Sequence, residues 1–536
     1  MKNLKVITLS AFTALALSAC GGGGGGGPQG DGILFWSNFG SAYTSALLSL
    51  IDDVEAETNI KVNHESQGSY PKLQTNINNS VATRTFPTIA TGYPDHFAGY
   101  IRSDIMLAMD DYIEQYNEAN SVSLLDDYYP EYLTENQELV KGHTLGLPFN
   151  KSTEVMTYNV DLFDYVKTLD NTITKLPETW ADFQNDGPKY LSALHTAGLF
   201  GTEKQDEQGA TIVEGGKYLY GKRGENGHVS EFFVEAKQLD PKDTSKGDLL
   251  VDFSQIAESD FNLIMWDAPD NLFITLVRQF GGSYTSYTEE DRQTARHGFA
   301  DFWSGDYKAK TRDALTMVYN LYANAPEGVN SRVFAITDSY NSDAFKAGKV
   351  LFTVGSSGGL SYNLPETNKF KVSVAPIPYK DADHKYVISQ GANLGLFDQG
   401  DDKTIEDAFK VIVSLTKGEI QGKWAATTGY YPATKSATNS KAYQALINEK
   451  QETPLKVLYQ DSAKLNQENY MKSTEKWIKF VDPGFVGSSV IREEVGKIIL
   501  PILNKRPDII SGKTTLDQAI DDTLAISVKA LEGYIR

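Results

Sequence analysis

The side chains able to perform covalent or acid–base chemistry are scattered along this sequence. The chain of 536 residues has 7 His and 1 Cys, with no HExxH motif, no Walker loop and no dinucleotide-binding motif after a strand. The histidines also lack the spacing of metal ligands, so neither a metalloenzyme nor a metal importer is predicted. A glycosidase needs only two carboxylates. Among 70 acidic residues such a pair leaves no signature, so this alternative stays open.

The single cysteine stands at the end of an N-terminal apolar run. Lys2 and Lys5 begin this segment, and the small residues Ser18 and Ala19 directly precede Cys20. This layout is that of a secretory signal, and it resembles the bacterial lipoprotein signal, in which the cysteine becomes the lipidated N-terminus. We therefore predict a signal peptide over 1–19 and a protein outside the cytoplasm, anchored to the bacterial membrane by palmitate and further acyl chains on Cys20.

A glycine-rich segment follows the cysteine. Because glycine costs little to bend and much to order, we predict that residues 20–31 form a flexible tether. The competing interpretation is a loop that binds phosphate. That loop would need a preceding strand and a following Lys-Ser or Lys-Thr, and the sequence has neither.

Charge and length exclude several classes of protein. The formal net charge of −20 argues against nucleic acid as a partner and against adhesion to anionic lipid. No apolar run after the leader is long enough for a transmembrane helix. The remaining ~500 residues exceed what one hydrophobic core holds, so two lobes are predicted.

Strands and helices alternate after the tether. The pattern predicts strands at 32–40, 60–62 and 86–91, a helix over 43–54 that ends at Asn59, and a helix over 72–83. Such alternation is typical of α/β proteins with a mostly parallel sheet, whose ligands bind at the carboxyl ends of the strands. The polar segment 201–255 predicts surface hairpins or an insertion. A C-terminal helix is expected to bury Leu516, Ala519, Ile520 and Leu524.

Six stretches occur in the order and spacing of a known family. They are LAMDDYIEQY (107–116), GHTLGLPFNKSTEVMTYNVDLF (142–163), LPETWADF (176–183), FKAGKVLFTVGSSGGL (345–360), SQGANLGLF (389–397) and KWAATTGYYPATKSA (423–437). No single stretch is diagnostic. Together they resemble the extracellular solute-binding proteins of carbohydrate ABC importers, in the glycerol-3-phosphate-binding-like branch.

The resemblance implies a two-lobe, periplasmic-binding-protein-type α/β fold, similar to maltose-binding protein. Each lobe would be a mostly parallel sheet flanked by helices, with a hinge of three crossings. Lobe 1 would comprise 32–148 and 377–425, and lobe 2 would comprise 149–376 and 426–536. The implied function is capture of a carbohydrate or polyol by hinge closure and delivery to an ABC permease. The protein would act as a monomer, without cofactor, metal or catalysis.

The resemblance also assigns residues to the ligand site. A sugar needs aromatic platforms, carboxylates, amides and backbone N–H groups. The side chains with distinct expected roles are Tyr70 as a contact, Asp95 as an acceptor for hydroxyls, Trp180 as a stacking platform, and Arg492 as a partner for phosphate or carboxylate. The remaining candidates are hydroxyl, aromatic or small residues at the crossings and strand ends, namely Ser152, Thr153, Ser356, Ser357, Gly358, Gly391 and Tyr430.

Each candidate has a structural alternative. Trp180 could pack at a helix start, the glycines could form tight turns, and Arg492 could pair with a nearby glutamate. Because 93–96 departs from the family pattern, Tyr93 or His96 could replace Asp95. The aromatic and arginine candidates favour a phosphorylated polyol, whereas 93–96 and 201–255 favour another ligand such as an oligosaccharide. The rival functions are a surface lipoprotein that binds glycan or protein for adhesion, and a binding protein for a non-sugar solute.

Overall fold

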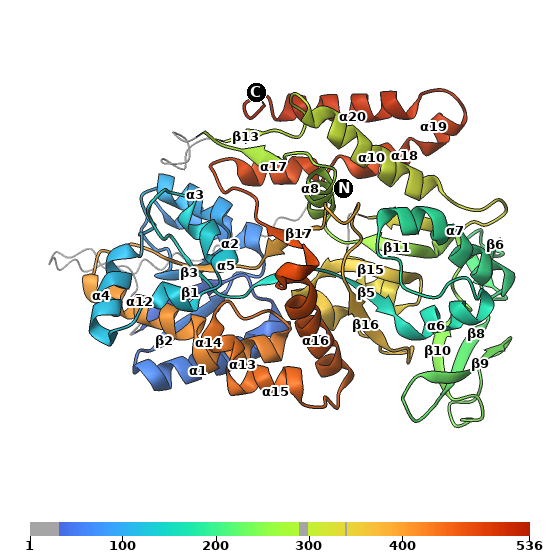
Figure 1. Cartoon of the computed structure of the whole chain (residues 1–536), viewed down its shortest axis with the longest axis horizontal. Helices are drawn as coiled ribbons and strands as arrows, with labels where there is room; N and C mark the ends of the chain where they lie inside the picture. Colours follow the sequence, from blue (N-terminus) through green and yellow to red (C-terminus); the bar gives the residue numbers. More distant parts are fainter. Residues whose placement is uncertain (1–31, 289–297, 338–339, 536) are drawn as a thin grey trace, which may run out of the picture.

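The computed structural model describes residues 32–288, 298–337 and 340–535. The predicted signal peptide, Cys20 and the tether lie outside the described residues. Figure 1 shows two lobes side by side, with helices α1 to α4 in the left-hand lobe and strands β5, β11 and β15 in the right-hand lobe. No helix within the described ranges has the length and apolar character needed to cross a membrane.

The smaller lobe is built on a five-stranded sheet with the order β2–β1–β3–β18–β4. Its strands are β1 (Ile33–Ser37), β2 (Val62–Ser66), β3 (Ile89–Gly92), β4 (Leu147–Pro148) and β18 (Asn393–Leu396). Successive residues of a strand face opposite sides, so Ile33 and Phe35 join one hydrophobic cluster while Trp36 packs against another. The helices of this lobe are α1 (Ser41–Thr58), α2 (Tyr70–Ser80), α3 (Pro94–Arg102), α4 (Asp110–Asn120), α5 (Pro130–Gln137), α12 (Asp402–Thr416) and α13 (Gly418–Thr428).

The larger lobe is built on a sheet with the order β14–β11–β15–β5–β17–β19, and β16 also pairs with β5. Its strands are β5 (Ser152–Asn159), β11 (Asn262–Trp266), β14 (Arg332–Ile336), β15 (Val350–Ser356), β16 (Val372–Ala375), β17 (Tyr386–Gln390) and β19 (Ile478–Phe480). The helices that pack on or beside this sheet are α6 (Val160–Leu169), α7 (Trp180–Thr196), α8 (Pro269–Gln279), α10 (Tyr307–Ala323), α11 (Ser342–Lys346) and α16 (Pro454–Leu465). One continuous hydrophobic cluster joins them.

The strands and helices predicted near the start of the chain are present, but β2 begins at Val62, where the predicted strand 60–62 ends. Strands β1, β2 and β3 are parallel neighbours, joined through α1 and α2. Asn59 ends α1 in the left-handed conformation (φ 55°), which asparagine tolerates better than most residues. The two-lobe α/β fold is confirmed as well.

Both sheets are mixed rather than mostly parallel. In the smaller lobe β18 is antiparallel to β3 and β4, and in the larger lobe β5 is antiparallel to β15, β16 and β17. Parallel neighbours need a crossover connection, whereas β5 and β18 each continue directly from a strand of the other lobe. Strand β17 also pairs in the larger sheet, so the chain re-enters the smaller sheet at Asn393 and not at 377.

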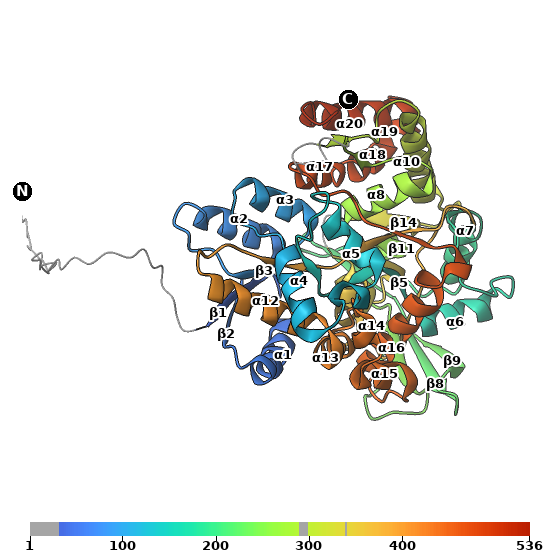
Figure 2. The ribbon, with the colours of Figure 1, turned by 60° about the vertical axis from the view of Figure 1, so that its left-hand side comes forward.

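Residues 201–255 form surface hairpins, as predicted. The first hairpin pairs β6 (Thr202–Gln205) with β7 (Thr211–Glu214), and a three-stranded sheet contains β8 (Tyr218–Arg223), β9 (Val229–Glu235) and β10 (Asp248–Asp252). This small sheet lies at the end of the larger lobe away from the smaller one (Figures 1 and 2). Arg223 fastens it by donating from Nη1 and Nη2 to the buried Asp161 carboxylate at 3.0 and 2.8 Å.

The C-terminal helices form a layer above the larger sheet together with α10 (Figure 1). They are α17 (Ser488–Val495), α18 (Ile499–Asn504), α19 (Arg506–Ile510) and α20 (Leu516–Ala530). Helix α20 buries Ala519, Ile520 and Leu524, and Leu516 is partly buried, as the sequence predicted. The remaining elements are β12 (Thr285–Ser286), β13 (Phe299–Ala300), α14 (Lys435–Thr438) and α15 (Lys441–Asn448).

Candidate functional site

A buried lysine holds the crossings between the lobes together. The Lys151 ammonium donates to the Gly391 carbonyl (3.0 Å) and to Asn393 Oδ1 (3.2 Å) of the second crossing. The Lys151 carbonyl accepts from the Tyr431 N–H (2.6 Å) of the third crossing. Glu135 of α5 balances the charge at 2.5 Å, and both side chains are almost fully buried. The hinge is therefore one hydrogen-bonded unit.

Gly391 occupies a position that only glycine fits. Its φ is +99°, and a Cβ there would lie 1.8 Å from the Asn150 carbonyl oxygen. The Gly391 N–H donates to the Tyr93 hydroxyl at 3.3 Å. Gly391 thus performs the turn role that was its structural alternative, and it also connects the hinge to the wall of the smaller lobe.

Two tyrosines and a histidine form that wall. Tyr70 begins α2 behind Ser69, which caps the helix, and Tyr93 directly precedes α3. The rings of Tyr70 and Tyr93 lie 4.8 Å apart, and Tyr70 lies 5.8 Å from His96. Burial raises the pKa of both tyrosines, so both remain hydroxyl donors at neutral pH. Asp95, in the first turn of α3, accepts from the His96 N–H at 2.9 Å.

Tyr430 lies at the third crossing on a second aromatic cluster. Its ring is stacked on Trp424 at 6.1 Å and packs beside Tyr43 at 5.8 Å. Gly358 lies directly against this ring, because a Cβ on Gly358 would approach Tyr430 to 2.6 Å. The Tyr43 hydroxyl donates to the Gly358 carbonyl, so the two lobes touch here.

Ser356 and Ser357 end β15 at the same junction. The Ser356 hydroxyl accepts from the Gly358 N–H at 3.2 Å, which caps the short 3₁₀ helix that follows. Residues 355–359 (GSSGG) also match the G-x-S-x-G pattern of hydrolase nucleophile elbows, a match that the motif analysis missed. The Ser357 hydroxyl contacts Tyr431 and accepts from the Thr153 N–H at 3.4 Å, so it bonds within the hinge rather than to a base.

Ser152 and Thr153 begin β5 and are buried. The Thr153 hydroxyl donates to the Ile388 carbonyl at 2.7 Å. This bond joins β5 to β17 within the larger sheet. The structure therefore gives Thr153 a role in holding two hinge strands together, next to the predicted site.

Trp180 lies in the interior of the larger lobe, with 2% of its surface exposed. Its Nε1 donates to Gln279 Oε1 at 2.7 Å, and its ring is stacked on Trp266 at 5.7 Å. Trp266 Nε1 in turn donates to Glu154 Oε1 at 2.9 Å. Trp180 is thus connected to the junction indirectly, through Trp266 and Glu154, and through Gln279, which donates to the Tyr386 carbonyl at the start of β17.

Sequence reasoning missed Glu154. This carboxyl is 1% exposed, and its Oε2 has no hydrogen-bond partner in the described part of the chain. Burial raises its pKa to about 8, so it carries a proton at neutral pH. The only sequence signal was a charged residue between Thr153 and the strand-like run VMTY (155–158).

Arg492 lies on α17 and faces three acceptors of its own lobe. Its Nε donates to Asp270 Oδ2 at 2.8 Å, its Nη1 to Asp482 Oδ2 at 3.3 Å, and its Nη2 to Asn271 Oδ1. Asp95 of the smaller lobe is close enough to act electrostatically on this cluster. In place of the glutamate of the structural alternative, Arg492 pairs with Asp482, 10 positions away, and with Asp270, 222 positions away.

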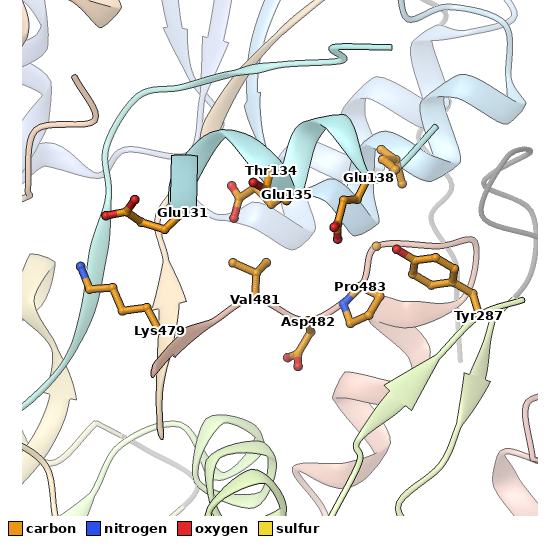
Figure 3. Close-up of a pocket in the computed structure, with 11 residues that line it drawn as sticks. Glu131, Thr134, Glu135, Glu138, Tyr287, Lys479, Val481, Asp482 and Pro483 are labelled. Carbon is orange, nitrogen blue, oxygen red and sulfur yellow. The ribbon is translucent and has the colours of Figure 1, made fainter. Parts of the chain in front are cut away.

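The structure thus gathers most candidates at the junction of the lobes. Tyr70, Tyr93 and Tyr430 lie within electrostatic reach of one another, and Tyr93 also senses Arg492. A cavity of about 240 Å³ opens beside this junction, between the acidic face of α5 and residues 479–484. Figure 3 shows Glu131 and Glu135 of α5, and Glu138 directly after it, on one side of this cavity, with Lys479, Val481, Asp482 and Pro483 on the other side. No group of three or more acidic, His or Cys side chains is arranged for a metal ion in the described ranges.

Comparisons with known proteins agree with this architecture. A family model described as bacterial extracellular solute-binding protein matches residues 49–450. The sn-glycerol-3-phosphate-binding periplasmic protein UgpB of Escherichia coli (strain K12) is 35% identical over 101 residues, which are 18% of this chain and 23% of UgpB. That alignment spans under a quarter of the relative.

Solved structures extend the likeness to nearly the whole chain. UgpB from Mycobacterium tuberculosis, in complex with glycerophosphocholine, has a TM-score of 0.60 at 15% identity and covers 94% of this chain and 99% of its own. The GacH receptor of Streptomyces glaucescens has a TM-score of 0.57 at 13% identity, with coverages of 94% and 98%. At such identities the likeness shows the fold alone. Because the family model spans more than half of the sequence, the chain belongs to the bacterial extracellular solute-binding proteins.

Proposed function

We propose that this protein is the substrate-binding subunit of a bacterial ABC importer and captures a carbohydrate or polyol between its lobes. The observation that carries the proposal is the junction itself, where Tyr70 and Tyr93 of one lobe approach Tyr430 and the hinge glycines. Aromatic faces cover the apolar side of a sugar ring, and hydroxyl and backbone groups bind its oxygens.

The relatives support this ligand class. The Mycobacterium tuberculosis protein binds glycerophosphocholine, and the GacH receptor was solved in complex with acarbose. MalE from Bdellovibrio bacteriovorus, with a TM-score of 0.54 at 12% identity over 93% of this chain and 99% of its own, was solved with maltotriose. All three ligands present several hydroxyl groups.

The contacts between the lobes support a closing mechanism. Tyr43 of α1 donates across the junction to Gly358, and Gly484 of the larger lobe lies against Pro94 of the smaller one. Both contacts are small, so hinge rotation can break and remake them. Binding energy would then be used to favour the closed state, which the permease recognises.

The location and partners of the protein follow from the same function. Its family is extracellular, so it acts outside the cytoplasm. We propose a lipid anchor on Cys20, action as a monomer, delivery of the solute to the transmembrane subunits of the permease, and no catalytic step.

A ligand panel tests the proposal. The purified protein is heated with maltotriose, monosaccharides, glycerol, glycerol 3-phosphate and glycerophosphocholine. A ligand at 100 times its Kd should stabilise the fold by about 2.7 kcal/mol. Tyr70→Ala and Tyr430→Ala should remove the shift, whereas Tyr307→Ala, on the exposed face of α10, should keep it. If no compound in the panel stabilises the protein, the proposal is wrong.

A further inference from the structure

Arg492 is the candidate assigned to pair with a ligand phosphate or carboxylate, and its surroundings do not favour that use. Each of its three guanidinium nitrogens already donates to a protein oxygen. Two carboxyl groups, Asp270 and Asp482, pair with this single arginine, so no net positive charge remains for a ligand anion. An incoming phosphate would have to displace them or lie beside them, and like charges at close range cost several kilocalories per mole in other interfaces.

The charge of Arg492 is neutralised within its own lobe however Asp482 titrates. Burial raises the pKa of Asp482, so this group could keep its proton. Asp270 alone then balances Arg492, and Asp95 acts on the same cluster from the smaller lobe. Burial also raises the pKa of Glu154, so this carboxyl is protonated at neutral pH and adds no charge to the cluster.

Two buried polar atoms near Arg492 have no hydrogen-bond partner among the described residues, and they indicate which ligand groups could bind there. The Tyr284 hydroxyl is buried (2% exposed), has no partner among the described residues, and lies within electrostatic reach of Asp482, Arg492, Asp270 and Asp95. Asp482 Oδ1 has no partner in the same ranges either. Buried polar atoms are normally paired. A hydroxyl group fits Asp482 Oδ1 in either protonation state, because it can donate to a carboxylate and accept from a carboxylic acid.

We infer that Asp270 and Asp482 are specificity-determining residues that hold Arg492 as a structural ion pair, so that this site selects neutral or cationic polyhydroxylated ligands and excludes phosphate and carboxylate. The inference rests on the proposed function, because it concerns the ligand of the same junction. It favours a saccharide or amino sugar over glycerol 3-phosphate. It assigns Asp482 Oδ1 and the Tyr284 hydroxyl to a ligand hydroxyl or ammonium group.

Calorimetric titration of the full chain tests the inference. The probes are maltose, glucose, glucosamine, glucose 6-phosphate, glycerol 3-phosphate and inorganic phosphate. The wild type should bind the best neutral or amino sugar at least about tenfold more tightly than any phosphorylated probe. Asp270→Asn should gain about tenfold or more in affinity for glycerol 3-phosphate or phosphate, because the charge that neutralises Arg492 is removed while the side chain keeps its shape. Asp482→Asn should gain less, because burial already raises the pKa of Asp482 toward its neutral form.

A matched control separates this local effect from a change in net charge. Asp517→Asn removes the same charge from an exposed carboxylate of α20 that pairs with Arg312 of α10, and this variant should bind every probe as the wild type does. Thermal melting of each variant establishes that it folds. The wild-type comparison of neutral with phosphorylated probes needs no variant.

Three results would overturn the inference. They are tight binding of glycerol 3-phosphate by the wild type that Arg492→Gln abolishes, no gain of phosphate binding in either folded aspartate variant, and an equal gain in Asp517→Asn. A phosphate-binding wild type would leave the importer proposal intact. A wild type that binds no sugar would contradict the carbohydrate proposal and the ligand class inferred from it, whereas a gain of phosphate binding in the aspartate variants would still support their role in holding Arg492.

Discussion

The buried carboxyl of Glu154 makes the stability of this protein depend on pH in a measurable way. Burial raises its pKa from 4.5 to about 8 in the folded state. Between these values the unfolded chain has lost the proton and the folded chain keeps it. The folded state then binds more protons, so the free energy of unfolding falls as pH rises through this window.

The magnitude follows from the size of the window. One bound proton corresponds to about 1.4 kcal/mol for each pH unit. Over the interval from 4.5 to about 8 the loss is about 5 kcal/mol at most. This is as large as the whole stability of a marginal domain, which is about 5 kcal/mol. The effect should therefore be visible above the titration of other groups.

Glu154→Gln isolates this contribution. The glutamine oxygen can keep the bond from Trp266 Nε1 (2.9 Å), and its amide takes the place of the protonated oxygen. Urea unfolding at pH 5, 6 and 7 should show wild-type stability falling, relative to the variant, by up to about 1.4 kcal/mol per pH unit. Glu214→Gln in the exposed strand β7 is the control and should keep the wild-type slope. Equal slopes for wild type and Glu154→Gln would refute the reasoning.

Three further changes test other parts of the structure. Lys151→Met leaves Glu135 buried without its partner and should lower the free energy of unfolding by about 3–5 kcal/mol in urea titrations, and a loss below about 1 kcal/mol would contradict the hinge description. Gly391→Ala places a Cβ against the Asn150 carbonyl and should cost more than about 1 kcal/mol by the same assay, so a neutral effect would contradict the observed backbone. Arg223→Met should speed hydrogen exchange in β8 to β10 and leave the larger sheet unchanged, and unchanged exchange in β8 to β10 would show that its bonds to Asp161 do not fasten the hairpins.

Local sequence signals predicted local structure well. The apolar spacing over 43–54 predicted α1, and Asn59 predicted its end, because a residue in the left-handed conformation ends a helix whatever the surrounding fold. The polar segment 201–255 predicted hairpins for a similar reason, since its turns depend on neighbouring residues. The two-lobe fold came from ordered motifs that extend over most of the chain.

The roles of individual site residues depended on distant partners and could not be predicted. Trp180 became an interior residue because Trp266 and Gln279, 86 and 99 positions away, complete its surroundings. Arg492 pairs with Asp270, which is 222 positions away. No spacing rule connects such residues, so a motif can mark a position without revealing which partner occupies its side chain.

The hydrogen bonds of Lys151 have a consequence for the kinetics of opening. One ammonium group and one carbonyl of this residue bind the second and third crossings, so no crossing can change its backbone angles alone. We therefore expect the backbone angles of the three crossings to change together during opening, and not independently. Opening should then be an all-or-none step with one relaxation time. The permease would meet molecules that are either open or closed, with few in between.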